Sequence, residues 1–157
     1  MSNQTDLISL SQGDGSALTG VGKVLQVVQG TTTTPVATTS ATPVDTGLSL
    51  SITPTSASSK ILILVSQYAR ASERADVGLG LTLVRDSTAI LTWADSNTAL
   101  YINVNDFRLA HSMVYLDSPA TTSSTTYKTQ IGSYGSGTIT AQNSNIPSTI
   151  TLMEIAG

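Results

Sequence analysis

The strongest hydrophobic signal in the chain is an unbroken apolar run at residues 61–65, flanked by Lys60 and Ser66. A segment rich in Ser and Pro, residues 54–59, precedes it. Five apolar residues, three of them β-branched, are typical of a strand that is covered on both faces. A buried helix is the alternative, but the run is short for a helix and its entry has little helical character.

Alternation along this strand divides its side chains between two faces. We expect Ile61, Ile63 and Val65 to face a core between two sheets. Leu62 and Leu64 then point the other way, and burying such a side chain stabilises a fold by about 1.5–3 kcal/mol. We therefore expect a second cover over both leucines, either the N-terminal segment or a neighbouring subunit, which makes them candidate subunit-interface residues.

Several other segments alternate between apolar and polar residues with the period of a strand. Leu48, Leu50 and Ile52 alternate with Ser and Thr, a pattern that indicates one buried face. Residues 79–93 form the best hairpin candidate, with a turn at residues 85–88. Further strands are predicted at residues 22–29, 77–83, 100–106, 107–116, 125–131, 137–141 and 149–155.

These segments add up to an all-β fold. About eight to ten short strands, frequent turns and no convincing amphipathic helix predict an antiparallel β-sandwich or jelly roll. A length of 157 residues suits one domain with its own core. We expect residues 21–157 to form that domain, and no repeat of fixed period indicates a β-helix or a fibre shaft.

Three segments lack a clear strand pattern. Pro35 and Pro43 cannot donate to a ladder, so residues 30–46 are expected to be an edge strand or a long loop. Residues 68–76 contain the one charged cluster and suit a short helical turn or a solvated loop. Arg70 and Arg74 in that cluster are the alternative candidates for a contact between subunits or with a partner.

Residues 1–20 are predicted to be an arm that precedes the domain. Leu7, Ile8 and Leu10 form a small apolar cluster, and the Gly-rich residues 12–16 that follow are typical of a turn or linker. The cluster is too small to fold alone, so the domain, another subunit or a partner must cover it. These three residues are therefore candidates for anchoring a partner.

Composition excludes several classes of partner. Charged residues make up 11% of the chain, against about 25% in an average protein, and the net charge is -3. The seven Lys and Arg residues form no basic run, so nucleic acid is not expected as a partner. No segment resembles a signal peptide or a membrane span, so we expect no membrane partner. Because charged residues are depleted at the centres of interfaces, the composition suits a chain that buries surface against copies of itself, and it suits a polar, uncharged monomer surface equally well.

No motif for catalysis or for a cofactor stands out. His111 is the only histidine, and no Gly-x-Ser-x-Gly nucleophile elbow accompanies it. The absence of Cys and the scattered carboxylates give no metal-ligand spacing. Asp106 and Asp117 are possible partners in glycoside hydrolysis, but nothing selects them over the other acids. We expect no enzyme activity, no cofactor and no metal.

Aromatic residues offer one candidate for glycan contact. Trp and Tyr rings stack on sugars, but they are also ordinary core and interface residues, and here they are spread along the chain. Tyr134 is the exception, because it lies in a Gly- and Ser-rich segment, residues 132–137, that suits an exposed loop.

Several strings together resemble a β-module of tailed-bacteriophage virion proteins. They are residues 17–29, 45–54, 58–65, 115–119 and 148–156, which span most of the chain from Ala17 onward. Such modules occur in capsid decoration, or cement, proteins and at the C-terminal ends of tail fibres. The resemblance implies a virion surface protein that is made in the host cytoplasm.

The resemblance favours a decoration protein over a fibre tip, because this chain has no shaft to project a tip. It implies a non-enzymatic homotrimer on the outer surface of the capsid, with the major capsid protein or another virion protein as its partner. The alternative is a tail-fibre or receptor-binding tip that recognises host glycans. A hydrolase acting on surface polysaccharide is a more distant option.

Overall fold

Short and medium-length strands make up most of the chain that the structure describes. The computed structural model describes residues 23–72, 77–94, 100–102, 106–135 and 137–157. Within these ranges it contains eleven strands and one short 3-10 helix, Asn143–Asn145. The strands are β1 (Val24–Thr32), β2 (Val36–Thr38), β3 (Val44–Ile52), β4 (Lys60–Ser72), β5 (Val77–Arg85), β6 (Thr88–Ala94), β7 (Leu100–Ile102), β8 (Phe107–Asp117), β9 (Thr125–Gly135), β10 (Thr138–Ala141) and β11 (Ser148–Ile155).

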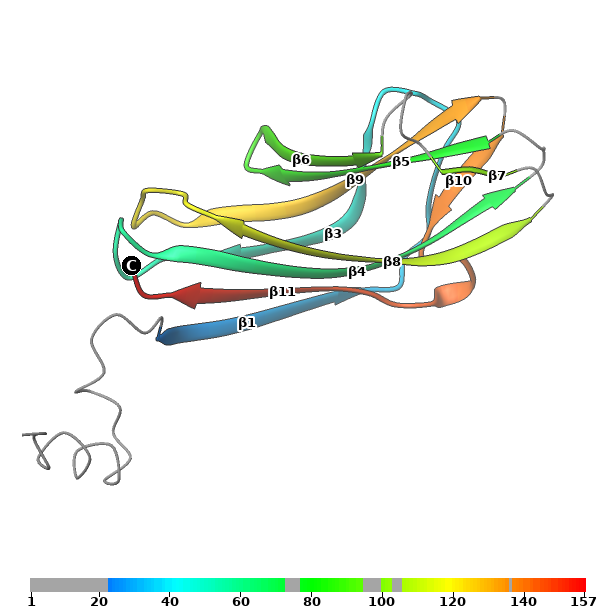
Figure 1. The fold of residues 1–157 in the computed structure, drawn as a ribbon. Coiled ribbons are helices and arrows are strands. Elements are labelled where there is room, and N and C mark those ends of the chain that lie inside the picture. The colour runs from blue at the N-terminus through cyan, green and yellow to red at the C-terminus, as the bar shows by residue number, and fades with distance from the viewer. Residues whose placement is uncertain (1–22, 73–76, 95–99, 103–105, 136) are drawn as a thin grey trace, which may run out of the picture.

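The strands form two antiparallel sheets that stack face to face (Figure 1). In the first sheet the order is β1-β11-β4-β8, and the short strands β10 and β2 continue beside the far end of β4. In the second sheet the order is β3-β9-β5-β6, and β7 also pairs with β5. The prediction of an antiparallel β-sandwich is confirmed.

The order of the eight main strands is that of a jelly roll. Numbered along the chain without β2, β7 and β10, the first sheet reads one, eight, three, six, and the second reads two, seven, four, five. Most main strands that follow one another along the chain, such as β1 and β3, therefore lie in opposite sheets, as in two nested Greek keys. The sequence predicted the class of fold. The order of the strands depends on which distant strands pair with one another, and local periodicity does not contain that information.

Alternation along β4 places its side chains as the sequence predicts. Ile61, Ile63 and Val65 are buried between the sheets, whereas Leu62 and Leu64 point to the opposite face and are only half-buried. The inner residues belong to one apolar cluster with members from both sheets, including Leu48, Ile52, Leu83, Met113, Tyr127, Ile150 and Leu152. A second cluster, built on Ala69, Val77, Leu79, Leu81, Ile131 and Ile139, fills the other end of the sandwich.

A buried polar network also links the two sheets. Thr129 on β9 donates to Gln67 Oε1 on β4 over 2.8 Å, and Gln67 Nε2 donates to Ser148 Oγ on β11 over 2.9 Å. Gln142 joins it, because its Oε1, when turned toward Gln67, accepts from Gln67 Nε2 over 2.7 Å. Thr46 on β3 completes the bridge through its hydroxyl contact with Thr129, 2.6 Å long. Satisfied buried networks of this kind favour one alignment of the sheets over others.

The structure corrects two predictions about irregular segments. The predicted turn or loop at residues 68–76 is wrong for its first half, because β4 continues through Ser72. Ala69 and Ala71 are small enough to pack inside the second cluster, so the strand extends beyond its strongly apolar part. The predicted loop at residues 132–137 is wrong as far as Gly135, because β9 runs through Tyr134 and pairs with β5.

Glycines allow a backbone segment to lie close against the outward face of the second sheet. Gly80 on β5 lies opposite Gly132 on β9, as the glycine pattern of that strand suggested. Backbone from the segment before β3 crosses here, since Ser133 N donates to Ser40 O over 2.8 Å. A side chain at position 132 would begin only 3.2 Å from Ala41 O. This segment covers a face of the second sheet that the sequence pattern alone leaves open.

Candidate assembly surface

The outward face of the first sheet carries a row of apolar side chains across four strands. The register places Val27 of β1 beside Met153 of β11, Met153 beside Leu62 of β4, and Leu62 beside Leu116 of β8. All four lie on the side of the sheet opposite the core. Val27 is 53% exposed and Leu116 is 49% exposed. This row lies on the surface although its composition is that of an interior.

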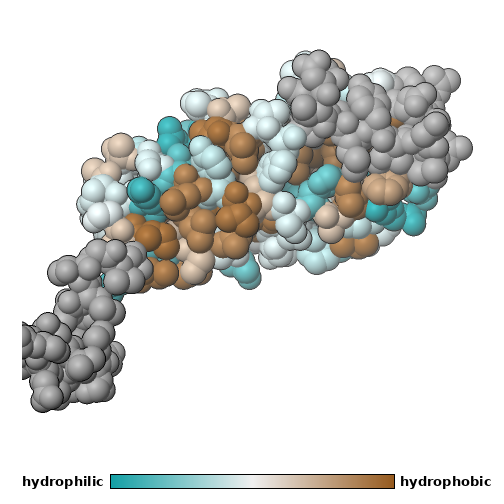
Figure 2. All heavy atoms as spheres, in the orientation of Figure 1, coloured by the Kyte–Doolittle hydropathy of each residue, from teal (hydrophilic) through white to brown (hydrophobic). Residues whose placement is uncertain are grey.

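The neighbouring rows extend this surface. The next row along the strands contains Gln29, Thr151, Leu64 and Val114, and Val114 is 66% exposed. On the other side, Val24 and Ile155 continue the apolar surface to Lys60. Figure 2 shows apolar residues gathered over the half of the molecule where β8, β4, β11 and β1 lie. We call this surface the apolar patch, consisting of Val24, Val27, Leu62, Leu64, Val114, Leu116, Met153 and Ile155.

Charged residues border the patch and do not enter it. Lys60 lies at one end, and beyond a row of Ser and Thr the opposite end carries Arg70 and Arg108 on adjacent strands. Asp106 accepts hydrogen bonds from both arginines. The hydrogen bond from Arg70 lowers the pKa of Asp106, so the carboxylate remains charged between two cations. Exposed pairs like these contribute little to stability, but they keep that end hydrated.

The outward face of the second sheet has the opposite character. Ser49 and Ser51 of β3 and Lys128 of β9 line it, and Lys128 donates to Asp45 over 2.7 Å. That hydrogen bond lowers the pKa of Asp45. Ser51 also shares a hydrogen bond with Thr126. One sheet therefore presents a hydrated surface, while the other presents the apolar patch.

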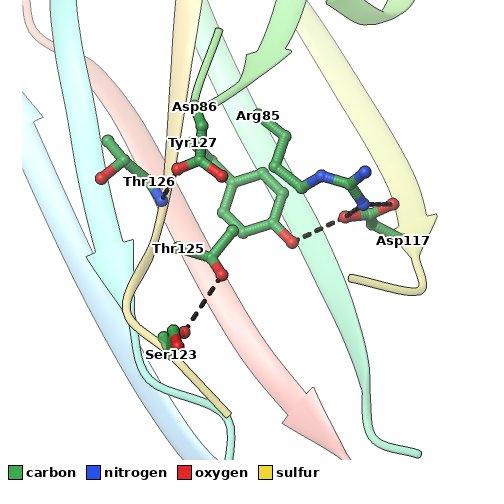
Figure 3. A network of polar contacts seen from close by, with 7 residues as sticks. All are labelled: Arg85, Asp86, Asp117, Ser123, Thr125, Thr126 and Tyr127. Atoms are coloured by element: carbon green, nitrogen blue, oxygen red, sulfur yellow. Dashed lines mark hydrogen bonds and ion pairs between the residues drawn. The ribbon is translucent and has the colours of Figure 1, made fainter. Parts of the chain in front are cut away.

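A polar cluster at one end of the sandwich holds the sheets together (Figure 3). Asp117, at the end of β8, accepts two hydrogen bonds from Arg85 Nη1, at 3.0 and 2.9 Å, and one from the Tyr127 hydroxyl at 2.7 Å. Arg85 and Tyr127 belong to the second sheet. Burial and the hydrogen bond to Asp117 raise the pKa of Tyr127, so the phenol stays protonated. This arrangement orients Asp117 as an acceptor and gives it a structural role.

A second carboxylate is buried beside this cluster. Glu154 of β11 accepts from Gln26 Nε2 at 2.7 Å and from both the backbone and the hydroxyl of Thr55, each at 2.7 Å. Burial raises the pKa of Glu154, but the hydrogen bonds from Gln26 and Thr55 outweigh it and bring the pKa to about 2. The carboxylate thereby ties β1, β11 and the segment before β4 together.

The residues considered for catalysis do not form a site. Asp106 and Asp117 flank opposite ends of the eleven-residue strand β8, so they are not a catalytic pair. His111 lies in the middle of β8, partly buried opposite Gln67. Burial lowers the pKa of His111, and its Nε2 has no hydrogen-bond partner among the residues described. Trp93 packs against both core clusters.

The structure places four of the predicted site residues and leaves four outside the described ranges. Leu62 and Leu64 lie in the apolar patch, and Arg70 lies at its charged border. Tyr134 lies within β9 opposite Gly78 and is partly exposed, so its place in a free loop is corrected. Leu7, Ile8, Leu10 and Arg74 are among the residues whose structure is not described.

Sequence reasoning did not identify Val114 and Leu116 as surface residues. The signal was present, because residues 113–116 form an apolar run that resembles residues 61–65. Such a run has apolar side chains on both faces of its strand. Recognising that β8 lies at the edge of the sheet required the three-dimensional pairing.

Within the ranges that the structure describes, no group of three or more His, Cys, Asp or Glu side chains could hold a metal ion. In the same part of the chain, no helix has the length and hydropathy needed to cross a membrane.

Comparison with protein-family models and with curated proteins gave no match. Among solved structures, the chain is similar to the VP2 subviral particle of infectious bursal disease virus, with 16% identity, a TM-score of 0.44 and coverage of 85% of this chain and 39% of that chain. A structure of the Gx strain of the same virus gives 13% identity, a TM-score of 0.42 and coverage of 85% and 40%. The chain spans about two fifths of the length of these proteins.

Proposed function

We propose that this chain is a non-enzymatic structural protein of a tailed-bacteriophage virion, which decorates and stabilises the outside of the capsid as a homotrimer. The observation that carries the proposal is the apolar patch on the outward face of the first sheet, bordered by charge. An exposed apolar surface of this kind, rimmed by polar residues, marks a site of protein association. The resemblance of several strings to virion surface modules supplies the setting.

The jelly-roll order of the strands is consistent with this proposal. The same architecture serves viral capsid proteins, lectins and cupins, so it narrows the class without deciding it. The cupin alternative would need a metal centre, and the described residues assemble no cluster of suitable ligands.

The mechanism follows from repeated weak contacts. Each copy would bury surface against its neighbours and against capsid subunits, and linked contacts of this kind bind more tightly than any one of them alone. Residues 1–20, with Leu7, Ile8 and Leu10, would anchor each copy to the major capsid protein or another virion protein. A shell clamped in this way resists the pressure of packaged DNA.

The copy number in purified virions tests the location. A decoration protein should be present in a fixed, high ratio to the major capsid protein, measured by quantitative mass spectrometry with labelled peptides. Deleting residues 1–15 should abolish attachment to capsids while leaving a folded oligomer. A copy number in the range of tail components would contradict the capsid location.

The second candidate function is a tail-fibre or receptor-binding tip that recognises host glycans. Tyr134 favours it, because this aromatic residue remains partly exposed near the end of β9, where it lies opposite Gly78. Binding on a glycan array that disappears in Tyr134→Ala would support this alternative. Glycan binding that is unchanged in the variant would remove Tyr134 from it.

A further inference from the structure

We infer that copies of this chain associate through the apolar patch, with the outward face of the first sheet of one copy packed on that of another. The inference rests on the self-association in the proposed function and names the surface that carries it. The inference does not depend on whether the protein lies on the capsid or on the tail.

The patch is compatible with a second copy of itself. A contact between identical surfaces brings each charge close to its own equivalent, which disfavours charged surfaces. Four rows of outward side chains cross the face, and the row of Lys60 is the first and the row of Ser112 the last. Apart from Lys60 at the outer end, the described side chains in these rows are apolar residues, Ser, Thr and Gln. No like charges would therefore meet within the patch.

The distribution of charge also fits an interface with a polar rim. Arg70, Arg108 and Asp106 lie two rows beyond the last of these four rows, at the far end of β4 and β8. Interfaces have apolar centres and hydrated, charged borders. A partner that is itself strongly charged would find no counterpart at the centre of this patch.

The size of the face approaches what a specific interface requires. Four strands about 4.8 Å apart and four rows about 6.8 Å apart cover about 500 Å². Two such faces bury about 1,000 Å² in total, which is near the lower limit for a specific protein interface. The extended sheet also offers a regular surface, and stacked sheets pack well at about 10 Å.

The exposed ends of the rows are the strongest reason for a partner. Val114 is 66% exposed and Val27 is 53% exposed, and they belong to β8 and β1, the two strands at the edges of this face. Contiguous exposed apolar side chains of this kind mark a surface of protein association. A second copy packed on this face covers Val27, Val114 and the half-buried Leu62 and Leu64 at once.

Val114→Asp tests this surface, because its side chain is exposed enough for the monomer to tolerate the change. The matched control is Ser49→Asp, which adds the same charge to the exposed outward face of the second sheet. We expect light scattering after size-exclusion chromatography to show an oligomer for the wild type and for Ser49→Asp. Val114→Asp should elute with the mass of one chain and keep the circular dichroism spectrum of the wild type.

Thiol protection provides a second measurement that does not require a disrupted interface. The chain has no cysteine, so Val114→Cys and Ser49→Cys each introduce a single thiol. We expect maleimide to react more slowly at position 114 than at position 49, and the rate at position 114 should rise several-fold on dilution. Protection that does not change with concentration in a chain that light scattering shows to be a monomer would mean that residues 1–22 of the same chain cover the patch, which would overturn the inference.

The outcomes separate this inference from the proposed function. An oligomer that persists in Val114→Asp, with an unprotected thiol at position 114, would show that copies associate through another surface. The proposed virion role would then stand, because the copy number in virions tests it independently. A wild-type chain that stays monomeric at every concentration would overturn both the inference and the proposed homotrimer.

Discussion

Tyr127 and Asp117 join the two sheets at one end of the sandwich: the Tyr127 hydroxyl on β9 donates to Asp117 Oδ2 at the end of β8, over 2.7 Å. Both side chains are buried, and Arg85 of β5 supplies two further hydrogen bonds to the same carboxylate. A buried carboxylate is costly unless donors surround it. The three residues therefore form a structural unit, although an acid beside a tyrosine and an arginine resembles a catalytic site.

Tyr127→Phe tests this role, since it removes the hydroxyl and keeps the ring in the core. We expect the free energy of unfolding to fall by about 1.5–3 kcal/mol, the usual contribution of a hydrogen bond to a charged group. Urea denaturation followed by circular dichroism measures it. Tyr115→Phe is the control, because Tyr115 packs against the same core and its hydroxyl makes no hydrogen bond among the described residues. Equal losses in both variants would contradict the structural role of the hydroxyl.

The turn between β5 and β6 depends on Asp86, which has a positive φ of 54°. Its backbone N donates to Thr126 O over 2.7 Å, and its Oδ1 accepts from Thr126 N over 2.9 Å (Figure 3). Asn tolerates the left-handed region and keeps the acceptor, whereas Ala does neither well. We expect Asp86→Asn to be nearly neutral and Asp86→Ala to cost about 1–2 kcal/mol in denaturant unfolding. A neutral Asp86→Ala would show that the turn does not depend on this side chain.

The class of fold was predictable because strand periodicity is a local property. Ile61, Ile63 and Val65 face the core and Leu62 faces outward, as alternation alone predicts. The continuation of β4 past Gln67 was not predictable in the same way. Ala69 and Ala71 carry little hydrophobic signal, and only contact with a distant part of the chain makes them core residues.

The apolar patch was only half predictable for a related reason. Leu62 and Leu64 were identified because a strand with apolar residues on both faces needs two covers. Val27 and Met153 are each ordinary when considered alone, and the register between β1, β11 and β4 brings them into one row with Leu62. Long-range register is the information that periodicity does not contain.

Glu154 should make the stability of the protein sensitive to acid. Its pKa is about 2 in the folded chain, against an ordinary value of 4.5. Because the folded pKa is the lower one, the carboxylate stabilises the fold above pH 4.5, and this stabilisation is lost as the pH falls from 4.5 toward 2. We expect thermal unfolding to shift downward across that window in the wild type.

Glu154→Gln separates this contribution from those of the other carboxylates. The amide keeps the size of the side chain but presents an NH₂ group where Gln26 Nε2 donates. We expect a loss of about 2 kcal/mol at pH 7 and a flatter dependence on pH between 4.5 and 2 than in the wild type. If the two proteins lose stability in parallel below pH 4.5, Glu154 is not the group responsible.

Adjacent residues of β4 should respond differently to truncation, because they face different surroundings. Ile63 is fully buried between the sheets, so Ile63→Ala should cost about 2–5 kcal/mol from lost contacts and the cavity left behind. That cost should be the same at every protein concentration. Leu64 lies in the apolar patch, so Leu64→Ala should change the stability of a dilute monomer little and weaken association instead. Unfolding curves at several concentrations distinguish the two, since only stabilisation by a second copy depends on concentration. A large loss in Leu64→Ala that does not vary with concentration would place its cover within the same chain.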